Sequence, residues 1–322
     1  MDYIYMKSLA RVGRRLGAAV VTLALVGCAD QAAPPRVVGA GEVFTTPEQA
    51  VEALVAANRA GDPGTIGRIL GPSASELISS GDPVADKAGE QKFVAAYDAQ
   101  HALETESDDK AILIVGQNHW PLPIPIVRVA ENAWQFDTAA GRQEILDRRV
   151  GRNESTVIDI CRTYVVAQRD YAQLQMRRNG IAHFAQHIIS TKGKKDGLYW
   201  PTKPGQPESP LGPMIAGAEA EGYHPGKKTD GPKPFHGYIF RLLKGQGAHA
   251  PGGAQSYMAG GHLTKGYGLI AVPAKYGDSG IMTFIVNQTG IVFEKNLGPD
   301  SLKAAAQLTV YDPDDSWHIA AP

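Results

Sequence analysis

The sequence predicts an α+β protein in which helices and antiparallel strands alternate in two successive groups. Apolar residues recur at helical spacing between residues 47 and 70 and again after residue 155. Short apolar runs bounded by turn residues follow each helical group, at 111–136 and at 238–293. We therefore expect N-terminal helices with a short antiparallel sheet, and then a long helix packed on an antiparallel meander.

Residues 1–27 have the layout of a bacterial lipoprotein signal peptide. Basic residues precede an apolar run from Leu16 to Val26, and Gly27 precedes Cys28. The run is shorter than the ~20 residues that span a bilayer, which argues against a transmembrane anchor. We expect cleavage before Cys28 and a lipid such as palmitate on this cysteine, which would attach the chain to the membrane.

The residues around the expected lipid indicate where the protein resides. Ala29 rather than Asp follows Cys28, which favours the outer membrane, on its periplasmic side, over the inner membrane. With Cys28 acylated, Cys161 is the single remaining cysteine, so no intramolecular disulfide is expected. The formal net charge of −1 gives no sign of a nucleic-acid partner.

The first folded segment follows a flexible tether at 28–44. Thr46 is expected to cap a helix with Pro47 in its first turn, and Gly61 to Pro63 ends it. Ile66, Ile69 and Leu70 indicate a second short helix, and 93–103 a third. Strands are expected at 111–115, at 124–129 and at 133–136.

This order of elements over residues 45–145 resembles the cone-shaped fold of nuclear-transport-factor-like domains, in which helices precede a sheet whose last strands carry aromatic residues. Trp134 to Asp137 lies at the corresponding end of the sheet. The resemblance implies a pocket, which Trp120, Trp134 and Phe136 would line for a small apolar ligand. The alternative is that these aromatic side chains fill the core.

The second group of elements, at 150–298, follows an Arg- and Gly-rich segment at 141–154 that we expect to contain the junction between two domains. From Ser155 to Leu174, apolar residues occupy much of the circumference of a helix. A shorter helix is expected within 180–195, and a long loop region rich in Pro and Gly at 197–231. Strands follow at 238–243, 269–272, 281–286 and 291–293, and a C-terminal tail at 299–322.

Two resemblances bear on the second group. Five segments, 196–200, 209–213, 236–238, 250–254 and 282–287, are similar to domain-of-unknown-function family 2950, a family of bacterial envelope lipoproteins, and the similarity extends from the first helix to about Gly298. The helix at 167–171 and the hairpin at 271–290 resemble, more distantly, the globular heads of type IV pilins and pseudopilins. A pilin helix begins with a membrane-spanning stretch, whereas this one follows another domain, so we expect a protein-binding role without pilus assembly.

The candidates for catalysis or metal binding are mostly histidines. His183 and His187 lie four residues apart, so a helix would place both on one face as a metal site requires. The metalloprotease pattern needs Glu after the first His, and Phe184 stands there, so solvated histidines are the alternative. His224, His236, His249 and His262 lie in glycine-rich loops. Apolar neighbours at helical spacing indicate that Cys161 is buried and inert.

Three classes of function remain open. We favour a non-catalytic envelope interaction or scaffold protein that holds an envelope protein partner. The second class is a small-ligand binding protein that uses the aromatic pocket. The third is an enzyme that binds a metal or acts on envelope polymers, with residues such as Asp196 and Glu208 as general acid and base. No nucleophile elbow or phosphate-binding loop occurs, so we expect no catalytic residues and no cofactor.

Overall fold

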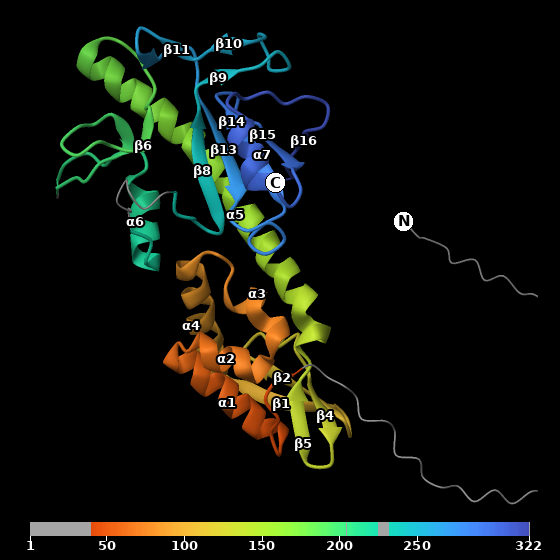
Figure 1. The fold of residues 1–322 in the computed structure, drawn as a ribbon. Coiled ribbons are helices and arrows are strands. Elements are labelled where there is room, and N and C mark those ends of the chain that lie inside the picture. The colour runs from red at the N-terminus through yellow and green to blue at the C-terminus, as the bar shows by residue number, and fades with distance from the viewer. Residues whose placement is uncertain (1–39, 204, 225–231, 322) are drawn as a thin grey trace, which may run out of the picture. The chain divides into compact units, whose positions relative to one another are not determined.

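The computed structural model describes residues 40–203, 205–224 and 232–321, in which one long helix joins two α+β lobes (Figure 1). We call residues 44–137 the N-terminal lobe and residues 181–321 the C-terminal lobe. The predicted signal peptide, Cys28 and most of the predicted tether lie outside the described residues. The predicted α+β class is confirmed: helices and a small antiparallel sheet come first, then a long helix and a second antiparallel sheet.

Helices form the first part of the N-terminal lobe. They are α1 (Pro47–Ala60), α2 (Pro63–Leu70), the single 3-10 turn η1 (Pro72–Ala74), α3 (Ser75–Ile78) and α4 (Pro83–Ala99). The predicted ends of α1 are confirmed, because the Thr46 hydroxyl accepts a hydrogen bond from Gln49 N and Gly61 adopts a φ of +61° just after the helix. The apolar stripe of α1 is buried against α2 and the sheet.

The sheet of the N-terminal lobe has the order β1-β2-β4-β5, with β3 paired to β2. Its strands are β1 (His101–Ser107), β2 (Lys110–Val115), β3 (Trp120–Pro121), β4 (Ile126–Ala130) and β5 (Ala133–Phe136). The predicted helix at 93–103 is wrong at both ends. Helix α4 begins at Pro83, which follows the cap Asp82, and residues 101–107 form a strand because they pair with β2.

Helix α5 (Thr138–Asn179) is 42 residues long and belongs to both lobes. It runs through 141–154, where we placed the junction between domains. Gly141 lets its first turns approach the N-terminal sheet, since a Cβ there would lie 2.3 Å from the carbonyl oxygen of Pro123. Farther along, Val157, Cys161 and Tyr164 are buried in the same cluster as residues of the C-terminal sheet.

The C-terminal lobe contains an antiparallel five-stranded sheet of order β16-β15-β14-β13-β8. Its strands are β8 (Tyr238–Leu243), β13 (Gly268–Pro273), β14 (Met282–Asn287), β15 (Val292–Asn296) and β16 (His318–Ile319). The first four agree closely with the predicted strands. Short hairpins at its edge involve β9 (Gly245–Gln246), β10 (Gln255–Ser256), β11 (Met258–Ala259) and β12 (His262–Leu263).

The segment between α5 and β8 differs from the sequence-based prediction. The helix expected within 180–195 is absent from these described residues; they instead contain β6 (His187–Ile189), which pairs in parallel with β7 (Gly197–Tyr199). Gly180 ends α5 with a φ of +69°, and the β-branched pair Ile188 and Ile189 favours the strand. The predicted loop region holds α6 (Gly212–Glu221), which has Pro213 in its first turn.

Residues 299–321, which lie in the predicted tail, include α7 (Ser301–Gln307) and β16. Ala305, Tyr311 and Trp317 are buried there with Ile270 and Ile285 of the central strands. Within the described residues, no helix combines the length and the apolar character needed to cross a bilayer.

Candidate functional site

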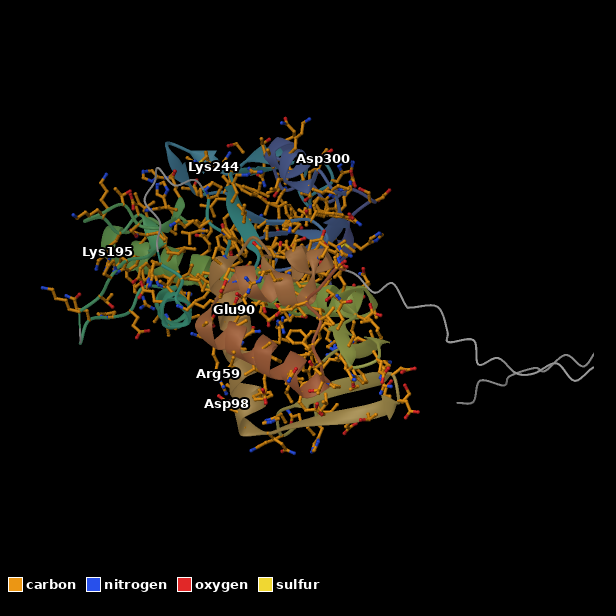
Figure 2. The ribbon with its side chains drawn as sticks, turned by 60° about the horizontal axis from the view of Figure 1, so that its bottom comes forward. Arg59, Glu90, Asp98, Lys195, Lys244 and Asp300 are labelled. Atoms are coloured by element: carbon orange, nitrogen blue, oxygen red, sulfur yellow. The ribbon has the colours of Figure 1, made fainter. Side chains whose placement is uncertain are left out.

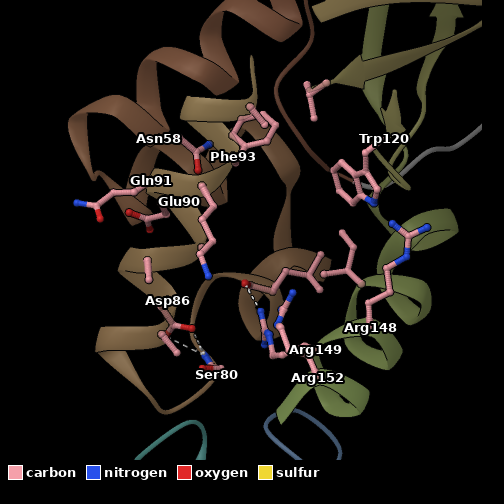
Figure 3. A pocket seen from close by; sticks show the side chains of 18 of the residues that line it. Asn58, Ser80, Asp86, Glu90, Gln91, Phe93, Trp120, Arg148, Arg149 and Arg152 are labelled. Carbon is pink, nitrogen blue, oxygen red and sulfur yellow. Dashed lines mark hydrogen bonds between the residues drawn. The ribbon is translucent and has the colours of Figure 1, made fainter. Parts of the chain in front are cut away.

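An open cavity with a volume of about 1320 Å³ lies beside α4 (Figure 3). Its floor is apolar and is made by core residues such as Leu54, Leu70 and Leu122. Helices α4 and α5 form two of its walls. None of the 17 residues of α4 is fully buried, because the cavity separates much of this helix from the core beneath it.

Basic side chains line the α5 wall. The Arg149 guanidinium has partners within the protein. It forms an ion pair with the buried Asp278, and it donates hydrogen bonds to the carbonyl oxygens of Glu76 and Leu77, at 2.8 and 2.6 Å. Arg148 pairs with Glu144 outside the cavity, and its guanidinium lies 5.2 Å from the ring centre of Trp120. Arg152 lines the cavity one helical turn beyond Arg148.

Acidic side chains line the opposite wall. Asp86 accepts hydrogen bonds from Ser80 N at 3.1 and 3.3 Å, yet burial raises the pKa of its carboxyl group. Burial, together with the nearby charge of Asp86, also raises the pKa of Glu90. Figure 3 shows Asp86 and Glu90 on α4, across the cavity from Arg149 and Arg152.

Three charged groups of the cavity have no fixed partner. Within the described part of the chain, the side chains of Glu90, Lys92 and Arg152 form no hydrogen bond or ion pair, although all three line the cavity. One is acidic and two are basic. A ligand with an apolar body and a charged group would therefore meet both kinds of surface that it needs.

One end of the cavity is held by a buried carboxylate. Asp82, 1% exposed, caps α4 by accepting hydrogen bonds from Val84 N and Ala85 N, both at 3.2 Å. Its other oxygen accepts hydrogen bonds from the Tyr223 hydroxyl and from Gly237 N, both at 2.9 Å. Asp82 thus fixes the beginning of α4 to the C-terminal lobe.

The backbone at residues 236 and 237 is adapted to this contact. Both residues have positive φ angles, +49° at His236 and +77° at Gly237. A Cβ on Gly237 would lie 2.7 Å from Nδ2 of Asn153, so only glycine fits without a shift. His236 lines the cavity with its Nε2 3.5 Å from Oε2 of Glu221, and burial lowers the pKa of its imidazole.

The three aromatic residues predicted to form a pocket do not share one. Trp120, 36% exposed, lines the cavity. Trp134 and Phe136 are buried in the core of the N-terminal lobe, where Trp134 also bridges to Phe44 and lies beneath the guanidinium of Arg128. The structure therefore assigns Trp120 to the cavity and the other two to the core.

The histidines lie in separate places. His183 and His187 do not share a helix, since His187 is in β6 and His183 precedes it. The ring of His183 instead lies 4.9 Å from that of His262, and His249 lies 3.1 Å from Asp312. Among the described residues, no three His, Cys, Asp or Glu side chains are grouped as a metal site would require.

The remaining candidates also fall outside the cavity. Asp196 accepts a hydrogen bond from Thr191 N at 2.7 Å, and Glu208 stands before α6. Cys161 is fully buried as expected, and burial raises the pKa of its thiol to about 12. A thiol in that state is not a nucleophile at neutral pH.

Sequence reasoning missed the charged walls of the cavity. The signal was present, because Arg148 and Arg152, like Asp86 and Glu90, are separated by one helical turn. The arginines fall within or beside the segment predicted to contain the junction, and the predicted third helix begins only at residue 93.

Comparison with known proteins identifies one family that the chain matches. A family model described as "Protein of unknown function (DUF2950)" matches residues 41–320. No curated protein and no solved structure matches the chain.

Proposed function

The chain belongs to the DUF2950 family, whose function is unknown, and on that premise we propose that it is a non-catalytic binding protein whose cavity beside α4 takes an amphipathic ligand. It acts in the cell envelope, where a lipid on Cys28 tethers it to the outer membrane and holds it in the periplasm. The tether follows from the sequence pattern of residues 1–28.

The observation that carries the proposal is the apolar floor of the cavity beneath α4. Leu54, Leu70 and Leu122 belong to the core, yet they also face a cavity of about 1320 Å³. Apolar surface that is concave and not filled by the protein's own side chains is typical of a ligand site. The unpartnered Lys92 and Arg152 would hold a charged group of the ligand at the edge of this floor.

The experiment is calorimetric titration of the purified protein with three probes that share one alkyl tail: dodecanoate, dodecyltrimethylammonium and dodecyl maltoside. Binding of any of them supports an amphipathic site, and their order of affinity reports the charge that the site prefers. Trp120→Ala should weaken binding roughly tenfold, because a half-buried indole contributes on the order of 1–2 kcal/mol of apolar contact.

The matched control is Ile291→Ala, which removes an exposed apolar side chain of the C-terminal lobe. It should leave probe binding unchanged. Absence of binding by all three probes, or equal loss in both variants, would remove the support for the cavity as a ligand site.

The scaffold function that the sequence favours stays a prediction, as does the distant likeness of the C-terminal lobe to pilin heads. Its test is crosslinking in cells followed by affinity capture, with a secreted variant that lacks Cys28 as control. A stoichiometric protein partner that is lost without Cys28 would support a scaffold at the membrane. No such partner would leave the cavity as the supported site.

A further inference from the structure

A second surface, at the C-terminal end of α5, is rich in basic residues. Residues 171–195 include Arg177, Arg178, Lys192, Lys194 and Lys195 and contain no Asp or Glu, although the whole chain has a formal net charge of −1. All five basic residues are exposed. Lys195 projects from the segment between β6 and β7 (Figure 2).

The fold brings the two halves of this segment together. The Tyr171 hydroxyl, on α5, donates a hydrogen bond to the carbonyl oxygen of Lys195 at 2.9 Å. Burial and the nearby charge of Asp196 raise the pKa of this Tyr171 hydroxyl, and the charge of Arg178 opposes them. Asp196, the carboxylate nearest in sequence to the lysines, accepts a hydrogen bond from Thr191 N, so it is partly engaged by its own loop.

Large aliphatic side chains are exposed among these cations. Met176 is 52% exposed, Ile181 65% and Ile189 44%. We call these three aliphatic and the five basic side chains the distal patch. Met176 precedes the two arginines in the last turns of α5, Ile181 follows the residue that ends the helix, and Ile189 ends β6 shortly before Lys192.

We propose that the distal patch docks on an anionic phospholipid membrane. Basic side chains are attracted to the negative surface, and exposed aliphatic side chains enter the boundary between headgroups and acyl chains. A single-stranded nucleic acid would instead favour exposed aromatic side chains for stacking, whereas the large exposed apolar residues here are aliphatic. The cavity beside α4 takes no part in this contact.

The test is sedimentation of the chain from residue 28 to residue 322 carrying Cys28→Ser, so that neither a lipid nor the apolar signal segment binds it to vesicles. Vesicles of phosphatidylcholine alone are compared with vesicles that also contain phosphatidylglycerol. We expect binding to the anionic vesicles only, with an affinity that falls as salt rises. Lys192→Gln combined with Lys194→Gln should weaken binding about 25-fold, since each basic residue near an anionic surface contributes about fivefold.

A matched pair of lysines outside the patch provides the control. Lys244 and Lys303 are exposed elsewhere in the C-terminal lobe, and changing both to Gln should leave binding unchanged. Ile181→Thr with Ile189→Thr should weaken binding even at high salt, where attraction by charge is screened.

Three results would overturn the proposal. They are equal binding to the neutral and the anionic vesicles, equal losses in the patch and control variants, and binding to a single-stranded oligonucleotide without binding to vesicles. Circular dichroism of each variant shows whether the fold is retained.

Discussion

The folded protein solvates the charged carboxylates of Asp86 and Glu90 less well than water does, because both side chains are partly buried. Burial raises the pKa of both groups, so the folded state binds their protons more tightly than the unfolded state does. The unfolding free energy therefore falls as pH rises from the ordinary Asp value of 3.8 through the higher pKa of folded Asp86. Above the pKa of folded Asp86, the unfolding free energy has lost this whole contribution and no longer changes with pH on its account.

Replacement of Asp86 by Asn should remove this component. An amide oxygen can still accept a hydrogen bond from Ser80 N, at a distance like the present 3.1 Å. Asp86→Asn should therefore gain stability relative to the unmodified protein as pH rises through the window, and keep the gain at neutral pH. Urea unfolding at a series of pH values measures it. The exposed Asp108 is the control: the unfolding free energy of Asp108→Asn should change with pH as that of the unmodified protein does. The same pH dependence in Asp86→Asn and the unmodified protein would contradict the prediction.

Among the helices, α5 contains two glycines with opposite surroundings. A Cβ added at Gly151 would meet no atom within 4 Å, whereas one at Gly141 would lie 2.3 Å from the carbonyl oxygen of Pro123. Gly151→Ala should stabilise the protein by about 0.5–1 kcal/mol, because glycine costs that much inside a helix. Gly141→Ala should destabilise it by roughly 2 kcal/mol through overpacking.

Thermal unfolding of the two variants, each compared with the unmodified protein, checks both signs at once. Equal shifts of the melting temperature in the two variants would mean that helix propensity alone sets their stability. The close approach of Gly141 to Pro123 would then make no contribution.

The elements that the sequence predicted correctly are those with local signals. Helix α1 has a cap, a proline and a C-terminal glycine, and strand β8 is a compact apolar run; both were predicted with nearly their observed ends. Strands β1 and β6 were missed because their partners, β2 and β7, decide their conformation. The cavity was missed for a related reason. Its walls belong to α4 and α5, and the residue pattern within one helix does not predict how far that helix lies from another.

Across the whole molecule, Asp82 and Arg149 join the N-terminal lobe to the C-terminal lobe. Asp82 bonds to Tyr223 and Gly237, and Arg149 pairs with Asp278. Both contacts are largely buried, and helix α5 contributes residues to the packing of both lobes. We therefore expect the described chain to unfold in one cooperative transition.

A comparison of Asp62 and Asp82, which both cap a helix and precede a proline, distinguishes the contribution of lobe joining from that of helix capping. Asp62 caps α2 by accepting a hydrogen bond from Thr65 N and is exposed, so Asp62→Ala should cost about 1 kcal/mol. Asp82→Ala should cost roughly 3 kcal/mol, because it also leaves Gly237 N and the Tyr223 hydroxyl without an acceptor.

Urea unfolding followed by circular dichroism and by tryptophan fluorescence measures both variants. Equal costs would show that Asp82 acts only as a cap. Two separate transitions in the unmodified protein would show that the lobes unfold independently.

The continuity of α5 restricts how this chain can change during evolution. One inserted residue would turn everything beyond it by about 100° around the helix axis and move it about 1.5 Å along. Val157 and Tyr164 would then leave the C-terminal core while Ile145 stayed with the N-terminal one. Insertions and deletions within 146–156 should therefore be selected against unless they come close to whole turns.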